Sequence, residues 1–323
     1  MVSGQVVIVA DCDHAAIDIE RGVLRDLCPE LAWLNCRAED EVIAQCAGAD
    51  GLLIMYAPLS RRVLEALPRC KVIVRYGVGV DTIDLKAAAE LGIVVSNVPD
   101  YGTQEVADHA LALMLALTRK VGTASALVKA GQWDFRLLRP IRRHQVQTIG
   151  IVGLGRIGRA MADRTRALGM KVLAYDPFVA ADQLPDFISL VSLEELLAQS
   201  DVVSVHCPLN DSTRLLLDEK RLRLMKPTAY LVNTARGSIV DERALDALLG
   251  EKKLAGAAMD VLAVEPGPAE HPLFRHENFL TTPHMAWYSE ESAQELKRKA
   301  AEEVRRVLRG EAALYQVNKF TPA

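Results

Sequence analysis

Short runs of aliphatic and β-branched residues alternate along the chain with longer stretches of mixed polarity. In the first third of the chain these runs lie at 6–9, 52–54 and 71–74. A second series begins near the middle, with runs at 149–152, 172–175, 202–205, 229–232 and 257–259. Short apolar runs separated by helical stretches are typical of βαβ units in a parallel sheet. The pattern therefore predicts an α/β protein with two doubly wound parallel-sheet domains.

Turn-forming residues separate the two series. The segment Asn-Val-Pro-Asp-Tyr-Gly at 97–102 predicts a junction, and residues 103–129 follow as one long, mostly apolar helical stretch. Near the end, residues 288–292 can cap a helix with one apolar face, formed by Ala293, Leu296, Ala300, Val304 and Val307. We expect this helix to return to the first domain. The predicted domains are a first domain, residues 1–98 and 290–323, and a second domain, residues 99–289, inserted into it.

Composition narrows the classes of function. The 323 residues carry 38 basic and 42 acidic side chains, a net charge of -4, with no long run of either sign. This balance argues against a nucleic-acid or membrane-surface partner. The six cysteines form no CxxC pair, which favours reduced thiols in the core. No basic leader precedes an apolar run, and no apolar run reaches the roughly 18 residues of a membrane span. We expect a cytoplasmic location and no metal site.

The strongest local motif is Gly153-Leu154-Gly155-Arg156-Ile157-Gly158, between the apolar run 149–152 and a helical stretch. Alone, a GxGxxG motif is a weak signal because glycine-rich turns are common. Between a strand and a helix it is typical of a dinucleotide-binding turn. There Gly153 permits the tight turn, Gly155 lets the backbone approach the pyrophosphate, and Gly158 lets the helix pack closely on the strand.

Asp176 indicates which dinucleotide is bound. About twenty residues beyond the glycine turn, the next apolar run ends in Ala174-Tyr175-Asp176-Pro177. A carboxylate at this position can accept hydrogen bonds from both hydroxyls of the adenosine ribose, and its charge repels a 2′-phosphate. The sequence therefore predicts NAD rather than NADP. A surface aspartate after an unrelated glycine turn is the alternative, and it leaves the spacing unexplained.

Three polar residues follow apolar runs in the second series: Arg236, Glu265 and His284. Carboxyl ends of strands in an open parallel sheet converge on the ligand crevice, so these residues can meet there. Arginine can hold a carboxylate bidentately, histidine can donate a proton near neutral pH, and a carboxylate behind the ring favours its protonated form. Taken singly, Arg236 is better explained as a surface ion-pair residue, Glu265 as a solvated loop acid and His284 as a packed histidine at a helix start. Their joint position predicts hydride addition to a 2-keto acid.

Together these motifs resemble the D-isomer-specific 2-hydroxyacid dehydrogenases, which include phosphoglycerate dehydrogenase and the C-terminal-binding-protein corepressors. The likeness covers about residues 49–310 and includes Arg75-Tyr76-Gly77-Val78-Gly79-Val80-Asp81, the glycine turn, residues 233–242 and Pro283-His284. The resemblance implies a Rossmann NAD-binding domain inserted into a discontinuous flavodoxin-like substrate domain. It also implies hydride transfer between nicotinamide and a 2-keto acid or D-2-hydroxy acid.

The resemblance assigns roles to individual residues. Arg236, Glu265 and His284 match the family's catalytic residues. Besides the glycine turn, the cofactor positions it implies are Val78, Arg156, Ile157, Asp176, Cys207, Thr234 and Asp260, with Cys207 acting through its backbone. The implied substrate-carboxylate loop consists of Arg75, Gly77, Val78 and Gly79. Together with the apolar stretch 103–129, the resemblance also indicates a homodimer.

Some features distinguish members of the family. The segment His284-Met285-Ala286-Trp287-Tyr288-Ser289 is similar to the HxAWYS segment of the C-terminal-binding proteins, where the tryptophan lines the substrate pocket. Packing at a domain junction is an equal alternative for Trp287.

Met55 stands where phosphoglycerate dehydrogenases have a phosphate-binding arginine, which argues against phosphoglycerate as substrate. Glu265 distinguishes the chain from formate dehydrogenases, which have glutamine there, but a homologous phosphite oxidiser shares all three catalytic residues. The alternative function is an NAD(H)-sensing dimeric scaffold resembling the corepressors.

Overall fold

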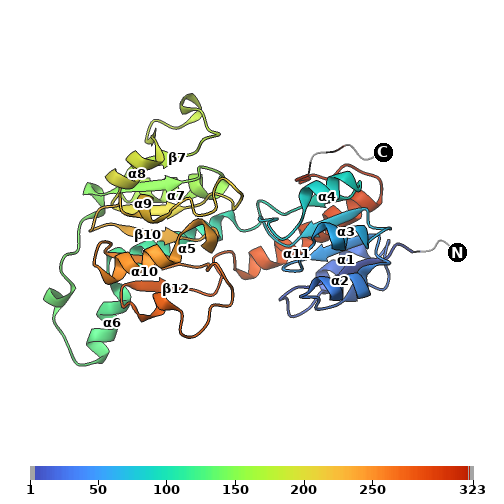
Figure 1. Ribbon diagram of the computed structural model, residues 1–323, viewed down its shortest axis with the longest axis horizontal. Coiled ribbons are helices and arrows are strands. Elements are labelled where there is room, and N and C mark those ends of the chain that lie inside the picture. The colour runs from blue at the N-terminus through green and yellow to red at the C-terminus, as the bar shows by residue number, and fades with distance from the viewer. Residues whose placement is uncertain (1–3, 319, 321–323) are drawn as a thin grey trace. The chain divides into compact units, whose positions relative to one another are not determined.

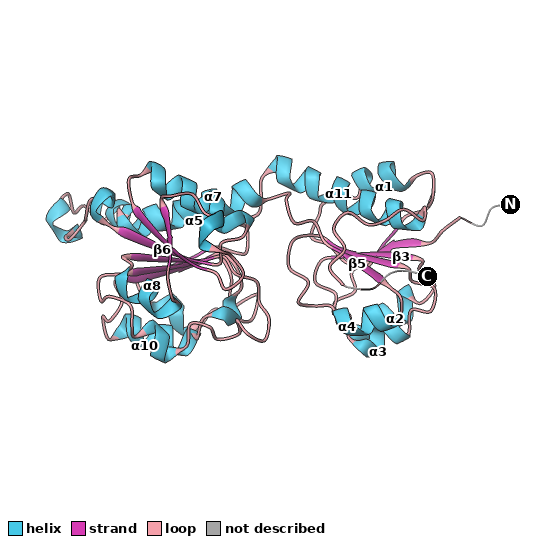
Figure 2. Cartoon of the chain, turned by 90° about the horizontal axis from the view of Figure 1, so that it is seen from above, coloured by secondary structure: helices cyan, strands magenta, loops and turns pink. Residues whose placement is uncertain are grey.

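The computed structural model describes residues 4–318 and 320 and divides into two compact units (Figure 1). The first unit combines the residues up to Gly102 with those from Ser289 onward, and the second unit is Thr103–Tyr288. Each unit is built on one parallel sheet with helices on both faces (Figure 2). The predicted α/β class with two doubly wound parallel sheets is confirmed.

The first unit contains a five-stranded sheet in the order β2-β1-β3-β4-β5. Its strands are β1 (Val7–Val9), β2 (Ala32–Trp33), β3 (Gly51–Ile54), β4 (Val72–Arg75) and β5 (Val94–Ser96). Its helices are α1 (Asp18–Leu24), α2 (Glu39–Cys46), α3 (Arg61–Glu65), α4 (Leu85–Glu90) and α11 (Glu290–Leu308). Helices α1 and α11 cover one face and α2, α3 and α4 the other (Figure 2). This strand order is that of flavodoxin-like folds.

Helix α11 returns to the first unit, as predicted. It begins after Ser289, whose hydroxyl accepts a hydrogen bond from the backbone N–H of Ser292 at 2.9 Å. The helix packs against α1, β3 and β4. The predicted apolar face is the one that is buried, with Leu296 and Val304 at its centre. The end of the chain is thereby part of the first unit's core.

The second unit contains a seven-stranded sheet in the order β12-β11-β10-β9-β6-β7-β8. Its strands are β6 (Thr148–Val152), β7 (Lys171–Tyr175), β8 (Ile188–Leu190), β9 (Val202–Val205), β10 (Tyr230–Asn233), β11 (Gly256–Met259) and β12 (Phe279–Thr281). Its α-helices are α5 (Thr103–Thr118), α6 (Val121–Lys129), α7 (Arg156–Ala167), α8 (Leu193–Gln199), α9 (Glu219–Leu222) and α10 (Glu242–Gly250). Counted from β6, this is the Rossmann order 3-2-1-4-5-6 with a seventh strand added.

The expected single helix over residues 103–129 is wrong. Lys120 adopts a left-handed backbone conformation, with φ of 54°, and divides the stretch into α5 and α6, which are bent by 54°. Helix α5 buries its apolar face in the second unit, whereas α6 has no buried residue. No single helix within the described residues is long and apolar enough to cross a membrane, although α5 and α6 together pass that test by length and composition.

Four short strands lie outside the predicted series: β2, β5, β8 and β12. Each stands at an edge of its sheet. Edge strands are short, and β2 with two residues and β8 with an exposed central Ser189 give only a weak signal. The apolar run Ile93-Val94-Val95 at β5 was a signal that sequence reasoning missed. The predicted core thiols are present, since all six cysteines are buried and unpaired.

Candidate active site

The glycine turn lies where the order of strands reverses in the second unit. It follows β6, and the segment His206-Cys207-Pro208 follows the neighbouring strand β9. Gly153 has a φ of +91°, and a Cβ on it would lie 2.6 Å from the backbone nitrogen of Cys207. Glycine is therefore required for the two loops to touch. In open α/β sheets, ligands bind in the crevice beyond the strands at such a reversal.

Gly155 and Gly158 have different surroundings. A Cβ on Gly158 would lie 2.1 Å from the carbonyl oxygen of Gly153, so this residue keeps α7 close to the turn. Nothing stands within 4 Å of a Cβ on Gly155, so the backbone there is open. Arg156 and Ile157 form the first turn of α7, where backbone N–H groups have no partner within the helix. This open helix start fits an anionic group such as a pyrophosphate.

Asp176 lies beside the glycine turn, as the sequence predicts. Its two carboxylate oxygens accept hydrogen bonds from the backbone N–H groups of Leu154, at 2.8 Å, and Phe178, at 2.9 Å. The side chain follows β7, which is paired with β6, and the residue is half-buried. Each carboxylate oxygen has room for a further hydrogen bond. The carboxylate therefore anchors the turn and remains able to accept from a ribose.

Thr234 and Cys207 lie at the ends of β10 and β9. The Thr234 hydroxyl is buried and has no hydrogen-bond partner among the described residues. A buried hydroxyl without a partner is costly unless a ligand or water satisfies it. Burial raises the pKa of the Cys207 thiol to about 11, which keeps it neutral and unreactive. The orphaned hydroxyl, the open glycine and the helix start together fit the expected dinucleotide.

His284 and Glu265 form a close pair. Nδ1 of His284 lies 2.6 Å from Oε2 of Glu265, and Oε1 of Glu265 accepts a hydrogen bond from the Leu262 N–H at 2.8 Å. Burial raises the pKa of Glu265, but the hydrogen bond and charge of His284, the Leu262 N–H and the charge of Arg236 outweigh it and hold the pKa below its ordinary value. Glu265 is therefore a carboxylate that supports a positively charged ring.

Asp260 holds the turn that presents His284. Its carboxylate accepts hydrogen bonds from the hydroxyl of Thr282 at 2.5 Å and from the N–H groups of Met285 and Ala286 at 3.0 and 2.9 Å. The N–H of His284 donates to the Asp260 carbonyl at 2.8 Å, and His284 has a left-handed φ of 52°. The structure thus gives Asp260 an anchoring role, and the predicted contact with nicotinamide stays a prediction.

Gly237 allows the loop that carries Arg236 to lie close to the loop that carries Glu265. A Cβ on Gly237 would lie 2.0 Å from the carbonyl carbon of Leu262, so the loops after β10 and β11 pack backbone to backbone. Arg236 is half-buried, and the amide of Asn233 donates to its carbonyl at 2.9 Å. Its charge acts on Glu265. The three predicted catalytic residues are therefore brought together at one edge of the sheet.

Trp287 contacts the backbone of His284. Its indole N–H donates to the His284 carbonyl at 3.1 Å, and its ring meets Tyr288 edge to face at 5.5 Å between centroids. These contacts fix the turn after the histidine. A role for Trp287 in lining a substrate pocket stays a prediction.

The predicted carboxylate loop lies in the first unit, at the carboxyl end of β4. Gly77 has a φ of +127°, and a Cβ on it would lie 1.8 Å from Nη1 of Arg75. The carbonyl of Gly77 accepts from Val98 N–H at 3.0 Å, and the Val78 carbonyl accepts from the Asn97 amide at 2.6 Å. Val78 is exposed and Gly79 half-buried. The roles of Arg75, Gly77, Val78 and Gly79 toward substrate stay predictions.

A buried polar network supports this loop and was missed by sequence reasoning. The Tyr76 hydroxyl donates to Glu20 in α1 at 3.0 Å, and the ammonium of Lys297 in α11 lies 3.8 Å from the other Glu20 oxygen. His14 meets the Tyr76 ring edge to face at 5.1 Å, and burial together with Lys297 lowers the pKa of His14 to about 4. The partners are far apart in sequence, so no local motif signals them.

A second missed residue is His109 in α5. Its Nε2 lies 2.9 Å from the hydroxyl of Thr282, which itself donates to Asp260. The helix before the sheet thereby contacts the turn that carries His284. Within the part of the chain that the structure describes, no group of three or more His, Cys, Asp or Glu side chains is arranged to hold a metal ion.

Known proteins are similar to this chain in both sequence and structure. Residues 111–286 match the family described as "D-isomer specific 2-hydroxyacid dehydrogenase, NAD binding domain". A D-3-phosphoglycerate dehydrogenase from Methanocaldococcus jannaschii is 38% identical over 87% of the chain, which spans about half, 54%, of that protein. A glyoxylate reductase from Thermofilum pendens is 39% identical over 87% of the chain and 85% of its own length.

Among solved structures, D-lactate dehydrogenase from Aquifex aeolicus in complex with NAD and lactic acid superposes with a TM-score of 0.87. It is 29% identical, and the match covers 94% of this chain and 96% of that chain. The similarities extend over both units, and the matched family domain is an NAD-binding domain, in agreement with the dinucleotide turn. The chain belongs to the D-isomer-specific 2-hydroxyacid dehydrogenase family, whose members are nicotinamide-dependent oxidoreductases of 2-hydroxy and 2-keto acids.

Proposed function

We propose that this protein reduces a small 2-keto acid with NADH and, in reverse, oxidises the corresponding D-2-hydroxy acid. The observation that carries the proposal is the His284–Glu265 pair at 2.6 Å, with the Arg236 charge acting on it. Similarity to a glyoxylate reductase and to a D-lactate dehydrogenase supports a small acid. Met55 is buried, at 4% exposure, and cannot hold a substrate phosphate, which supports an unphosphorylated one.

In the proposed reaction, bound NADH supplies a hydride to the carbonyl carbon of the substrate. The guanidinium of Arg236 binds the substrate carboxylate with two parallel hydrogen bonds and keeps its charge throughout. His284 directs Nδ1 at Glu265, which leaves Nε2 to donate a proton to the carbonyl oxygen as that oxygen gains the electron pair. One hydride and one proton convert the keto acid into the hydroxy acid. Glu265 stabilises the charged ring before transfer and fixes its orientation.

The proposed dinucleotide is NAD rather than NADP. Asp176 places a carboxylate beside the glycine turn, where a ribose 2′-phosphate would meet its negative charge. The adjacent first turn of α7 presents backbone N–H groups to the pyrophosphate. The buried hydroxyl of Thr234 supplies a further hydrogen-bonding group on the same edge of the sheet.

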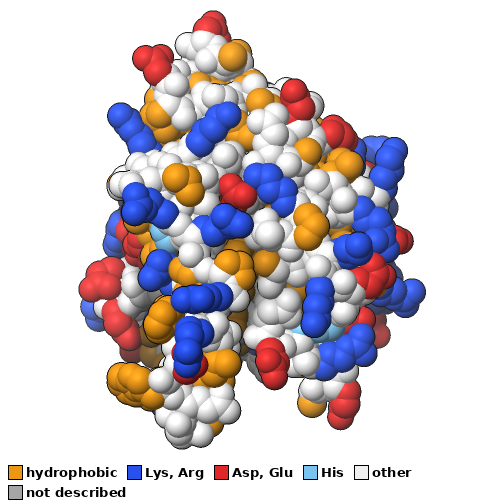
Figure 3. Space-filling model, turned by 90° about the vertical axis from the view of Figure 1, so that its left-hand side faces the viewer, with side chains coloured by type: hydrophobic (Ala, Val, Ile, Leu, Met, Phe, Trp, Pro, Cys, Tyr) orange, Lys and Arg blue, Asp and Glu red, His pale blue; other side chains and the backbone are white. Residues whose placement is uncertain are grey.

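We also propose that the protein is a homodimer through the segment that begins with α6. Several large apolar side chains of this segment are exposed: Val121, Val128, Trp133, Phe135, Leu137 and Val146. Figure 3 looks onto the side of the second unit on which Figure 1 places α6, and hydrophobic side chains lie on the lobe at the bottom of this view. Apolar side chains gathered on one segment favour a protein interface. Two aromatic residues, with exposures of 88% for Trp133 and 71% for Phe135, are the natural anchors.

The first prediction concerns turnover. With NADH and a panel of glyoxylate, pyruvate, 4-methylthio-2-oxobutyrate and phenylpyruvate, at least one acid is reduced, as measured by loss of NADH absorbance. Arg236→Gln lowers kcat/KM by roughly two to three orders of magnitude, because losing one partner of a close charge pair costs about 2–5 kcal/mol. Tight NADH binding without turnover of any acid contradicts the proposal and favours the cofactor-sensing scaffold instead.

The second prediction concerns pH. The pKa of Glu265 is held below its ordinary value by the hydrogen bond and charge of His284, so Glu265 stays a carboxylate and reduction persists as the pH falls through the ordinary glutamate range and declines only below it. Replacing Glu265 by glutamine removes the carboxylate that orients the ring of His284, so kcat/KM falls by about tenfold or more and that acid decline is lost. Glu270→Gln removes an exposed carboxylate from the same loop and serves as the control. An unchanged profile in Glu265→Gln, with hydride transfer rate-limiting, refutes the assignment.

The third prediction concerns the choice of cofactor. Asp176→Ser removes the charge that repels a 2′-phosphate, so the ratio of kcat/KM with NADH to that with NADPH falls by about tenfold or more, or about 1.4 kcal/mol. Asp176→Asn keeps an acceptor for the Leu154 N–H and separates loss of charge from loss of the anchoring bond. Equal ratios in wild type and both variants contradict the role of Asp176.

The fourth prediction concerns the dimer. Light scattering after size exclusion gives twice the chain mass of 35.4 kDa for the wild type. The double variant Trp133→Glu/Phe135→Glu is a monomer, because burying two unpaired charges opposes association. Leu91→Glu, at an exposed apolar residue of the first unit, stays dimeric. A monomeric wild type, or a double variant that remains dimeric, rejects this interface.

A further inference from the structure

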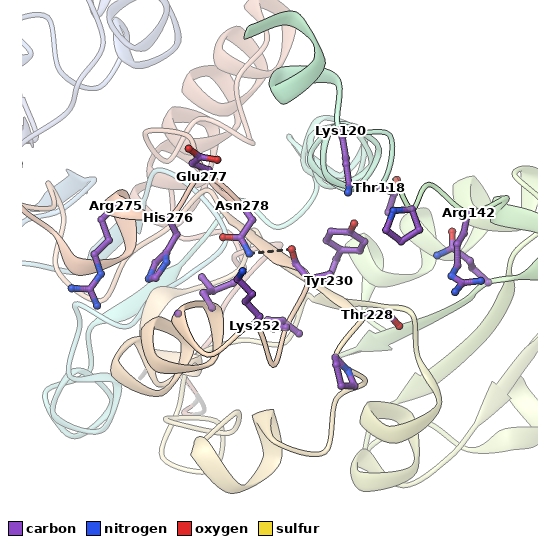
Figure 4. Close-up of a pocket in the computed structure, with 17 residues that line it drawn as sticks. Thr118, Lys120, Arg142, Thr228, Tyr230, Lys252, Arg275, His276, Glu277 and Asn278 are labelled. Atoms are coloured by element: carbon purple, nitrogen blue, oxygen red, sulfur yellow. Dashed lines mark hydrogen bonds between the residues drawn. The ribbon is translucent and has the colours of Figure 1, made fainter. Parts of the chain in front are cut away.

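A cavity of about 600 Å³ lies in the second unit at the amino end of its sheet. Tyr230 at the start of β10, Ala255 before β11 and Asn278 before β12 line it, together with residues from both sides of the α6 segment (Figure 4). Arg236, Glu265 and His284 follow the opposite ends of these three strands. The cavity is therefore separate from the candidate active site.

Basic side chains dominate the lining of this cavity. They are Lys120, Arg142, Lys252, Arg275 and His276, and Glu277 is the acidic residue that the lining contains. In Figure 4 they come from several segments around Tyr230, with Lys120 and Arg142 on the side of residues 118–147. Lys and Arg side chains also spread over the middle of the face in Figure 3, which looks onto this end of the second unit. The site therefore favours an anion.

Part of this charge is neutralised within the protein. Arg275 donates to both carboxylate oxygens of Asp246, at 2.9 and 2.7 Å, and Nε2 of His276 lies 2.7 Å from one of them. Lys120, Arg142 and Lys252 form no ion pair with any residue in the described ranges. Three cations from three separate segments thus border one cavity without an ion-pair partner, and Glu277 is the acidic side chain that shares the lining with them.

The cavity also contains a buried polar atom that lacks a partner. Gln147 is 6% exposed, and its side-chain oxygen has no hydrogen-bond partner among the described residues. Because the amide can present either its oxygen or its nitrogen, it can accept from a ligand or donate to one. Buried polar groups are nearly always satisfied, so a ligand or a water is expected to bond to this atom. The half-buried ring of Tyr230 offers a flat surface beside it.

We propose that this cavity binds a phosphorylated small molecule of nucleotide size. Lys120, Arg142 and Lys252 hold its phosphate groups, and Gln147 and Tyr230 contact its uncharged part. Charge-assisted hydrogen bonds from lysine and arginine are the usual means of holding phosphate. The volume is within the range of roughly 300–1,000 Å³ typical of small-molecule sites. The site is distinct from the cofactor turn, which lies at the other end of the sheet.

The test is isothermal titration of ATP into the protein saturated with NADH, so that the dinucleotide site is already filled. We expect saturable binding with about one ATP per chain. Arg142→Gln/Lys252→Gln weakens it by about tenfold or more, because two charge-assisted contacts are lost. Lys253→Gln makes the same kind of change at an exposed neighbour outside the cavity and leaves binding within about twofold. Adenosine, which has no phosphate, does not bind detectably.

Several results overturn the proposal. They are absence of saturable ATP binding, equal weakening by Lys253→Gln, and displacement of NADH by ATP. Binding that appears only in the monomeric Trp133→Glu/Phe135→Glu variant also overturns it, because the cavity would then belong to the subunit interface. Binding is read independently of turnover, so the outcome does not depend on the proposed reaction. Undiminished NADH binding by the charge variants shows that they are folded.

Discussion

The loops after β10 and β11 touch at Gly237, where no side chain fits between the two backbones. This contact sets the distance between the loop that carries Arg236 and the loop that carries Glu265. His284 is then placed by a different constraint, the carboxylate of Asp260, which gathers the N–H groups of Met285 and Ala286. The positions of Arg236, Glu265 and His284 thus depend on one backbone contact, at Gly237, and on one buried carboxylate, that of Asp260.

In each unit, a carboxylate before a strand also accepts a hydrogen bond from the backbone of the neighbouring strand. Asp50 before β3 accepts a hydrogen bond from Val6 N–H, and Asp201 before β9 accepts one from Thr148 N–H. Each is paired with a basic side chain, Arg69 or Lys226. Such pairs tie the starts of neighbouring strands together. The similarity follows from the shared parallel topology, in which adjacent strands begin at the same edge.

The sequence predicted those features of the fold and the site that depend on a single short segment. Buried central strands have continuous apolar runs and were predicted, whereas the four short edge strands were missed, although the run Ile93-Val94-Val95 marks β5. The glycine turn, Asp176 and the Arg-Glu-His residues each sit in a short segment with its own pattern. The network of Glu20, Tyr76 and Lys297 joins three distant segments, so only the folded chain reveals it. The break at Lys120 was also missed, because Lys120 is not a glycine although its φ is positive, and Gly122 two residues later was taken as part of one helix.

The six buried cysteines have a practical consequence. Five of them lie in the first unit and Cys207 lies in the second, and none forms a disulfide. An alkylating reagent in water cannot reach a buried thiol until the surrounding structure opens, so its rate of reaction reports the frequency of opening. Mass spectrometry of the labelled peptides would assign that frequency to each unit separately. The chain thus carries native reporters of its local unfolding in both units, with no need for an introduced label.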